Sequence, residues 1–247
     1  MQNQLLTILG GILTNAVAGG KEEPGTIEKR AVQADGDDYD YQVYVPPNSN
    51  EKRLPVLIFL HGIGQRGGGG IIPTSGAASA ISRHYFGQVP AIVLVPQCRA
   101  GSYWSDPVME KTVTNALAQT VAECGADDRR VSLVGVSMGG YGVWHFAVRQ
   151  PKKFAALVSI CGGSSIVEGE RFAPIAEKVG KTPAWLFHGA DDKIVPVSES
   201  RQIVKAIEEN GGSVKYTEYA NVGHNVWLNV LGEKDLLSWI LAQRLEK

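Results

Sequence analysis

The chain has 247 residues, of which 44% are hydrophobic and 20% charged, and its 24 Lys and Arg nearly balance its 25 Asp and Glu. Folding a chain of this size buries roughly 70% of the surface that the unfolded chain exposes. The composition therefore indicates an ordinary globular protein and argues against a disordered chain or a basic nucleic-acid-binding protein.

The first twenty residues are predicted to form a separate amphipathic segment. The apolar stretch from Leu5 to Ala18 is shorter than the ~20 residues that a membrane-spanning helix needs, so no membrane span is expected. Its apolar side chains recur at helical spacing, which favours a helix docked on the rest of the protein. Its length also suits a leader peptide, but residues 1–4 lack the Lys or Arg of a signal sequence. Both interpretations stay open, and so does the compartment, cytoplasmic or exported.

Residues 21–247 are predicted to form a single α/β domain. Strands at 26–33 and 39–45 surround a turn at Gly36-Asp37-Asp38 and open the sheet as an antiparallel hairpin. Beyond the hairpin, short apolar runs alternate with longer segments of helical periodicity. Strands are predicted at 54–60, 91–96, 131–136, 155–161, 184–188 and 214–219, and helices at 77–85, 108–124, 138–150, 197–210 and 226–245. Continuous apolar strands are typical of a parallel sheet covered on both faces, so the fold class is a doubly wound, mostly parallel α/β sheet.

A glycine-rich motif follows the strand at 54–60. Gly62-Ile63-Gly64-Gln65-Arg66-Gly67 satisfies GxGxxG, the pattern of dinucleotide-binding turns. That pattern requires an acid about 20 residues later to bind the ribose hydroxyl, but no acid lies between Glu51 and Asp106. Further glycines and a proline follow the motif, where a dinucleotide site would begin a helix. We therefore expect no cofactor.

A second motif points to nucleophilic catalysis. Gly135-Val136-Ser137-Met138-Gly139 matches GxSxG between the strand at 131–136 and the helix after it. A serine on such a tight turn is exposed at the carboxyl edge of the sheet, and the glycines beside it remove side chains that would collide there. Ser137 is therefore a candidate nucleophile. The structural alternative is a capping serine in a glycine-rich turn.

A serine nucleophile needs a base, and the base needs an orienting carboxylate; in this fold both come later in the chain. Asp192 is the favoured acid, with Asp191 second, because both follow the strand at 184–188. Of the five histidines, only His224 follows the acid in a loop between the last strand and the last helix. The order Ser137, Asp192, His224 predicts a catalytic triad.

The intermediate of acyl transfer carries a negative charge that fixed donors must stabilise. The backbone amide of Met138 follows the nucleophile, and a second amide is expected from the loop after the strand at 54–60. We assign it to Ile63, next to Gly62. The glycines of this loop then give the backbone room to approach the substrate.

Five segments between residue 54 and the C-terminus carry a resemblance to a known family. They are LIFLHGIGQRG, LVPQCRAGSYW, ADDRRVSLVGVSMGGYGVWHFAVRQPKKFAALVSICGG, HGADDKIVPVSESRQIV and NVGHNVW. The chain resembles the α/β-hydrolase superfamily, and within it the bacterial predicted-peptidase or carboxylesterase group related to feruloyl esterases and polyhydroxybutyrate depolymerases. The resemblance implies that Asp192 rather than Asp191 is the acid, and that Trp104 and Trp227 line the acyl or aryl pocket. No cap domain is evident in the sequence.

Together, these residues predict a serine carboxylic-ester hydrolase that acts through an acyl-enzyme. Without a cap, the site is expected to be an open cleft for a small-molecule ester or an ester-decorated polysaccharide. The resemblance implies short-chain or aromatic acyl groups, such as acetyl or feruloyl. A serine peptidase is one alternative, and a non-catalytic binding module of the same fold is another.

Three cysteines without CxxC spacing predict neither a disulfide framework nor a zinc site, and we expect no metal. Cys98 and Cys161 lie near predicted sheet edges, as a disulfide or as two buried thiols, and free thiols are the default expectation. Arg66 or Arg99 would steer anionic substrates if either faced the cleft, although solvated loop positions are the simpler expectation.

Overall fold

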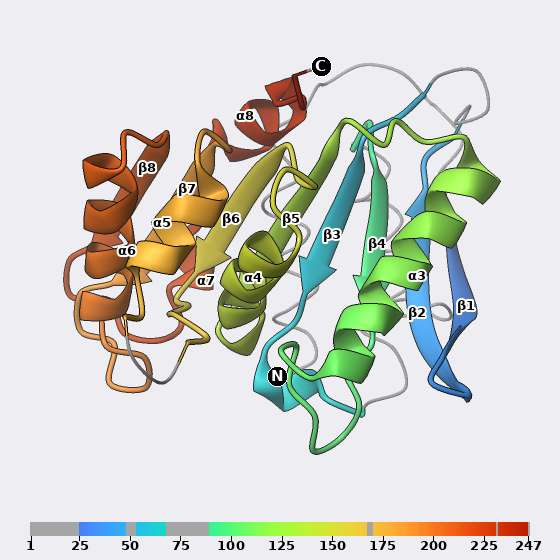
Figure 1. Ribbon diagram of the computed structural model, residues 1–247, viewed down its shortest axis with the longest axis horizontal. Helices are drawn as coiled ribbons and strands as arrows, with labels where there is room; N and C mark the ends of the chain where they lie inside the picture. The colour runs from blue at the N-terminus through green and yellow to red at the C-terminus, as the bar shows by residue number, and fades with distance from the viewer. Residues whose placement is uncertain (1–24, 48–52, 68–88, 167–169, 231, 247) are drawn as a thin grey trace.

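The computed structural model of the protein describes residues 25–47, 53–67, 89–166, 170–230 and 232–246. Within these ranges the strands are β1 (Thr26–Ala34), β2 (Asp37–Val45), β3 (Val56–Leu60), β4 (Ile92–Pro96), β5 (Val131–Val136), β6 (Ala156–Ile160), β7 (Ala184–Gly189) and β8 (Val214–Tyr219). They form one eight-stranded sheet in the order β1-β2-β4-β3-β5-β6-β7-β8 (Figure 1). β2 pairs antiparallel with β1 and with β4, and all other neighbours pair parallel. The predicted fold class is confirmed.

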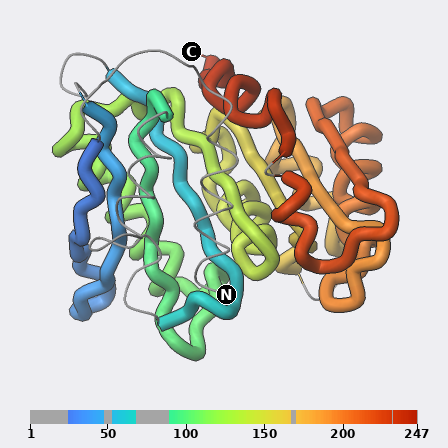
Figure 2. The backbone as a smooth tube through the Cα atoms, turned by 180° about the vertical axis from the view of Figure 1, so that it is seen from behind, coloured from blue at the N-terminus to red at the C-terminus, as the bar shows by residue number. Residues whose placement is uncertain are grey.

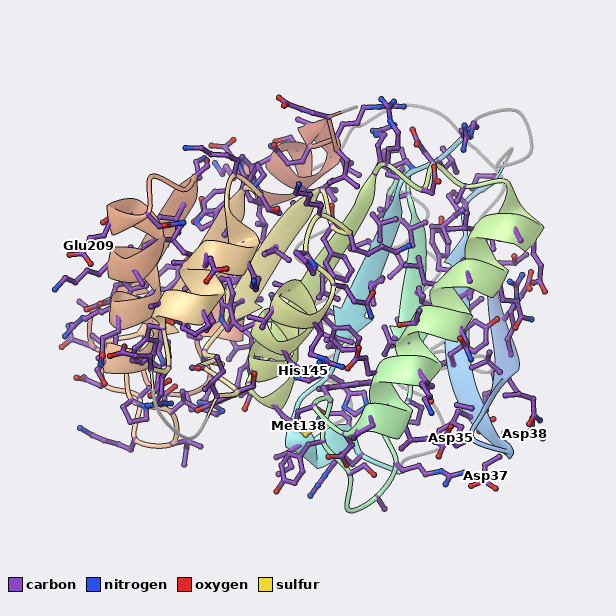
Figure 3. The ribbon with its side chains drawn as sticks, in the orientation of Figure 1. Asp35, Asp37, Asp38, Met138, His145 and Glu209 are labelled. Atoms are coloured by element: carbon purple, nitrogen blue, oxygen red, sulfur yellow. The ribbon has the colours of Figure 1, made fainter. Side chains whose placement is uncertain are left out.

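The hairpin turn between β1 and β2 is Asp35-Gly36, so the predicted turn at Gly36-Asp37-Asp38 is wrong by one residue. Both turn residues have positive φ, 51° and 88°. This is the geometry of a two-residue hairpin turn that matches the twist of the strands and prefers Asp-Gly. Asp37 instead begins β2 and pairs with Ala34, although isolated propensity places aspartate in turns. Figure 3 labels these aspartates at the tip of the hairpin.

The five central strands, β3 to β7, are buried along their whole length. The edge strands β1 and β8 have partly exposed side chains instead. A strand is buried on both faces only when other elements cover both faces of the sheet. The continuous apolar runs of the sequence are therefore the middle of the sheet. β3 begins at Val56 rather than at Leu54, directly after Pro55, which has no N–H for the ladder.

Helices pack on both faces of the sheet. They are α3 (Pro107–Cys124), α4 (Met138–Arg149), α5 (Ala173–Val179), α6 (Ser198–Glu209), α7 (Trp227–Val230) and α8 (Leu236–Ala242). The first four cover the face that is turned to the viewer in Figure 1, and α7 and α8 lie on the other face, seen in Figure 2. Two clusters of buried apolar side chains follow this division, one including Trp144 and Ile203 and the other Val230 and Leu237. The sheet is thus the middle layer between two apolar cores.

Two helical predictions need correction. The helix predicted at 226–245 is the pair α7 and α8, because glycine at 232 disfavours a continuous helix and its N–H closes a turn on the Asn229 carbonyl. The sequence patterns missed α5 and the 3₁₀ turn η2 (Ile63–Gln65), which are too short for helical periodicity to detect. The helix predicted at 77–85 and the segment 1–20 lie outside the described residues.

In the part of the chain that the structure describes, no helix combines the length and the apolar character needed to span a bilayer. The carboxyl ends of the parallel strands all face one edge of the sheet, the lower edge in Figure 1. The loops after β3, β5, β7 and β8 leave from this edge and carry the predicted site residues. A doubly wound sheet brings such loops together from distant parts of the sequence.

Candidate active site

Ser137 stands between β5 and α4 in a backbone conformation that residues with side chains rarely adopt. Its φ is 55° and its ψ is −116°, a strained combination that the surrounding structure must enforce. Its N–H donates to the carbonyl of Ile160 at 2.8 Å, and its carbonyl accepts from the N–H of Tyr141 at 3.1 Å. Held on both sides, the turn presents the serine side chain at the carboxyl edge of the sheet.

Two glycines allow this turn to form. A Cβ at Gly135 would lie 2.1 Å from the carbonyl oxygen of Gly139, and a Cβ at Gly139 would lie 1.9 Å from the carbonyl oxygen of Leu60. Both distances are far inside van der Waals contact, so neither position accepts a side chain unless the backbone moves. The GxSxG spacing is therefore a packing requirement where β3, β5 and α4 meet.

The three residues of the predicted triad come together at this edge. The Oγ of Ser137 is 2.9 Å from the Nε2 of His224, and the Nδ1 of His224 is 2.7 Å from the Oδ2 of Asp192. An ionised carboxylate only accepts hydrogen bonds, so Nδ1 carries a proton and donates it to Asp192. Nε2 is then free to accept the proton of Ser137. This is the tautomer that general-base catalysis needs.

Main-chain hydrogen bonds connect the loop after β7 with the loop after β8. The N–H of Asp191 donates to the carbonyl of Val222 at 2.9 Å, and the N–H of Ala190 donates to the carbonyl of Tyr219 at 3.0 Å. One loop carries the predicted acid and the other carries the predicted base. Their separation is therefore set by the backbone as well as by the contact between the two side chains.

The carboxylate of Asp192 is shielded from solvent. Its Oδ1 accepts from the N–H groups of Ile194 at 2.8 Å and Val195 at 2.9 Å. Burial by itself raises the pKa of Asp192, but hydrogen bonds from His224 and the two amides outweigh burial and hold this pKa below its ordinary value. The acid is thus ionised at neutral pH, as it must be to stabilise a protonated His224.

Met138 and Ile63 are the predicted oxyanion donors. Met138 is the first residue of α4 and Ile63 the first of η2, positions whose N–H groups have no partner within their own helix. Gly62 lies next to Ser137, since a Cβ built on it would be 3.7 Å from the Cβ of Ser137. Figure 3 labels Met138 at the same edge, beside η2. The loop and the helix start therefore both border Ser137, and the role of their amides stays a prediction.

His61 is fully buried and joins the loop after β3 to the loop after β4. Its Nε2 accepts from the N–H of Cys98 at 3.1 Å, so its Nδ1 carries the proton, which points to the carbonyl of Gly62 at 2.8 Å. Its own carbonyl accepts from the indole N–H of Trp104 at 2.9 Å. The sequence interpretation only set His61 aside as a base and missed this role. The sequence signal that could have indicated this role is the position of His61 between a buried strand and Gly62.

The buried His61 makes the stability of the protein depend on pH. Burial lowers its pKa from 6.5 to about 4. The unfolded chain therefore binds this proton more readily than the folded protein. The stability linked to His61 is complete above pH 6.5 and is lost as the pH falls towards 4. Chemical denaturation across this range should show a loss of about 3 kcal/mol in the free energy of unfolding from this residue.

His61→Gln is the control because it removes the titrating ring. The free energy of unfolding should fall less steeply between pH 6.5 and 4 in this variant than in the wild type. The free energy of unfolding of His61→Gln should still fall somewhat over this pH range, since burial also lowers the pKa values of His145 and His188. A slope equal to that of the wild type would contradict a neutral, buried His61.

The two tryptophans predicted to line a pocket occupy different surroundings. Trp104 is 1% exposed and lies beneath the loop after β3, where its indole holds the His61 carbonyl. Trp227 is partly exposed and meets the ring of His224 at right angles, with centroids 5.7 Å apart. The structure thus places Trp227 beside His224 and Trp104 under the loop after β3. Their contact with a substrate stays a prediction.

Two arginines named from the sequence are held by protein groups. Arg66 donates to the carbonyl of Ser102 at 3.0 Å and lies over the ring of Tyr103. Arg99 pairs with Asp37 of the hairpin at 3.0 Å. The charge of Arg99 is therefore already paired, whereas Arg66 belongs to the loops that border the site.

Cys98 and Cys161 are buried free thiols, so the expected unpaired state is confirmed. The Sγ of Cys161, a carboxylate oxygen of Asp192 and a ring nitrogen of His224 lie within 4.8 Å of one another, which suits a metal ion. However, burial raises the pKa of the Cys161 thiol far above its ordinary value. Asp192 and His224 also already share a hydrogen bond. This donor set favours proton transfer over metal binding.

A family model matches this chain, and the known proteins that are similar to it include the following three. The family model described as "Putative esterase" matches residues 33–202. A solved thermostable esterase is 29% identical with a TM-score of 0.76, over 88% of this chain and 63% of that chain. Carboxylesterase SOBER1 of Arabidopsis thaliana is 26% identical over 136 residues, 53% of this chain and 55% of that protein.

The third protein is the acylaminoacyl peptidase of Pyrococcus horikoshii. It is 16% identical with a TM-score of 0.70, over 92% of this chain and 43% of that chain. At that identity the likeness shows the fold alone. The chain spans less than two thirds of the length of each of these three proteins.

Proposed function

Because the chain belongs to the Esterase family and has the α/β-hydrolase fold, we propose that it is a serine carboxylic-ester hydrolase that works through an acyl-enzyme. The observation that supports this proposal is the hydrogen-bonded series from Ser137 through His224 to Asp192, with distances of 2.9 and 2.7 Å. A nucleophile, a base and an orienting acid in this order are what nucleophilic acyl transfer requires.

In the first half-reaction the Oγ of Ser137 attacks the ester carbonyl carbon while the Nε2 of His224 takes its proton. The carbonyl π electrons move to oxygen, and the amides of Met138 and Ile63 stabilise that oxyanion. Asp192 stabilises the imidazolium that forms. His224 then protonates the leaving oxygen as its bond to carbon breaks. The products are a free alcohol and an acyl ester on Ser137.

In the second half-reaction water takes the place of the alcohol. His224 removes a proton from the water as its oxygen adds to the acyl carbon, and the same two amides stabilise the new oxyanion. Collapse breaks the bond between the acyl carbon and the Oγ of Ser137, and His224 returns the proton to that oxygen. A carboxylic acid leaves and the starting state is restored.

Exposed apolar side chains follow the strands that end at the edge of the sheet with Ser137. Among the described residues, the exposed large hydrophobic side chains are Ile63, Tyr103, Ile194 and Leu228, between 44% and 71% exposed. They follow β3, β4, β7 and β8, all at the edge that carries the triad. An apolar border with a few fixed polar groups suits an ester with a short-chain or aromatic acyl group, such as acetyl or feruloyl. The ester can be a small molecule or a decoration of a polysaccharide.

A panel of acetyl, butyryl, octanoyl and feruloyl esters tests the activity and the acyl class. We expect kcat/KM for the best short or aromatic ester to exceed that for the octanoyl ester by at least ~10-fold, because methylenes that do not fit a site each cost about 1–3 kcal/mol. A peptide anilide should be cleaved far more slowly than the matching aryl ester. Faster cleavage of the anilide would support a peptidase instead. Ester binding without turnover would support a binding module.

A further inference from the structure

A second histidine contacts the carboxylate oxygen of Asp192 that faces His224. The ring of His188, near the end of β7, is fully buried. Its Nε2 is 3.3 Å from the Oδ2 of Asp192 and 3.0 Å from the carbonyl oxygen of Val195. Its Nδ1 is 2.7 Å from the Oγ of Ser200, which is buried in the first turn of α6. The ring therefore connects the triad acid to both β7 and α6.

These neighbours decide which ring nitrogen of His188 carries the proton. The two atoms that face Nε2 are a carbonyl and a carboxylate oxygen, which only accept, so Nε2 is the donor. In the neutral ring, Nδ1 then accepts from the hydroxyl of Ser200. Burial lowers the pKa of His188 below its ordinary value, so the ring is neutral at pH 7. It contributes one N–H, which donates to the Val195 carbonyl, and the Nε2 that carries it lies 3.3 Å from the Oδ2 of Asp192.

With this contact, both oxygens of Asp192 are held from more than one direction. Its Oδ1 accepts two main-chain amides, from Ile194 and Val195, and its Oδ2 faces the two imidazoles. A carboxylate with donors on both oxygens has little freedom to rotate. Such support from outside the reacting groups is what keeps a catalytic side chain within the narrow geometry that it needs.

We propose that His188 is a positioning residue, whose Nε2–H, on a ring anchored by Ser200, holds the Oδ2 of Asp192 in the orientation that receives the Nδ1–H of His224. This inference rests on the proposed function, because His188 acts only through the triad. A displacement of a catalytic group by about 1 Å can lower a rate by ~10²-fold. The donor on His188 therefore affects the rate of acyl transfer although it touches no substrate.

Two variants with side chains of similar length separate the effect of losing the donor from the effect of losing the bulk of the ring. His188→Gln keeps an amide N–H near the position of Nε2, and His188→Met has no donor. We expect His188→Met to lower kcat by roughly 10–100-fold with little change in KM, and His188→Gln to recover most of that loss. Thermal unfolding is measured for both. Equal losses of kcat in two equally stable variants would overturn the proposal.

An Asp192→Ala background tests whether His188 acts through the acid. The readout is the rate at which a fluorophosphonate labels Ser137, which is measurable in slow variants. With Asp192 present, His188→Met should slow labelling by about 10-fold or more. With Asp192 already removed, it should slow labelling by less than about 2-fold, because the coupled partner is gone. Equal slowing in both backgrounds would show a general packing role and overturn the proposal.

Two further variants keep this inference separate from the proposed function. Turnover that survives in Ser137→Ala would refute the serine mechanism itself, whereas an inactive Ser137→Ala beside a fully active His188→Met refutes only the positioning role. Should His188→Met fail to fold, Ser200→Ala replaces it, because it removes the hydroxyl that anchors the Nδ1 of His188 and keeps the ring. It should lower kcat by roughly 3–10-fold, and only when Asp192 is present. An unchanged kcat would overturn the proposal.

Discussion

Replacement of Ser137 by alanine is expected to lower kcat on every ester substrate by at least ~10³-fold while the fold stays intact. The variant keeps the base and the main-chain amides, so it still binds an ester, but it has no oxygen to form the acyl-enzyme. Stability should change little, because the turn is held by main-chain hydrogen bonds to Ile160 and Tyr141 that alanine retains. Steady-state kinetics and thermal unfolding of the same preparation measure both effects.

Ser238→Ala is the matched control for that variant. Its hydroxyl is exposed on α8, so full turnover is expected. If Ser137→Ala kept more than about a tenth of the wild-type kcat, contrary to the usual loss for a nucleophile, the nucleophile would have to be another residue. The α/β-hydrolase fold would be unaffected by that result.

Asp192→Asn should have the second large effect, a fall in kcat of roughly 10³–10⁴-fold. The side-chain oxygen of asparagine must stay at the Oδ1 position, where the N–H groups of Ile194 and Val195 need an acceptor. Its NH₂ group then occupies the Oδ2 position and faces His224 as a donor. The Nδ1 of His224 becomes an acceptor, so the proton moves to Nε2. In that tautomer the ring donates to Ser137 and cannot accept its proton.

Asp191→Asn is a close control for this prediction. The two aspartates are adjacent, but the side chain of Asp191 is exposed, and only its backbone N–H contributes to the contact between the two loops. The kcat of Asp191→Asn should stay near that of the wild type. A large loss in Asp191→Asn together with a small loss in Asp192→Asn would transfer the role of acid to Asp191.

The sheet was predictable because strands that are buried on both faces consist almost entirely of apolar residues. Strands covered on both faces are continuous apolar runs, and β3 to β7 are such runs. The predicted hairpin turn is misplaced because it groups Gly36 with Asp37 and Asp38, which instead pair within the ladder. The sequence predicts one last helix because its apolar side chains continue past the glycine at 232. The helical backbone does not continue there, since α7 ends at Val230 and α8 begins at Leu236.

The positions of Ser137, Asp192 and His224 were predictable because topology alone brings the ends of parallel strands to one edge. The contacts around them were not, because they depend on tautomers and side-chain orientation. His188 is one of the four histidines that do not follow the acid in the chain, yet the turn after β7 folds back and returns Asp192 to it. His61 was likewise considered only as a base, and its hydrogen bond from Cys98 depends on the loop after β4.

The central claim is that Ser137 is the nucleophile and that His224 activates it. Mass spectrometry after exposure to a fluorophosphonate tests it most directly, because the reagent reacts fastest with an activated serine oxygen, with loss of fluoride. The account predicts one adduct per wild-type chain, on the peptide that contains Ser137, none in Ser137→Ala, and labelling slowed by at least ~10²-fold in His224→Gln. An adduct on another residue, or an ester-hydrolysing protein that takes up no label, would contradict it.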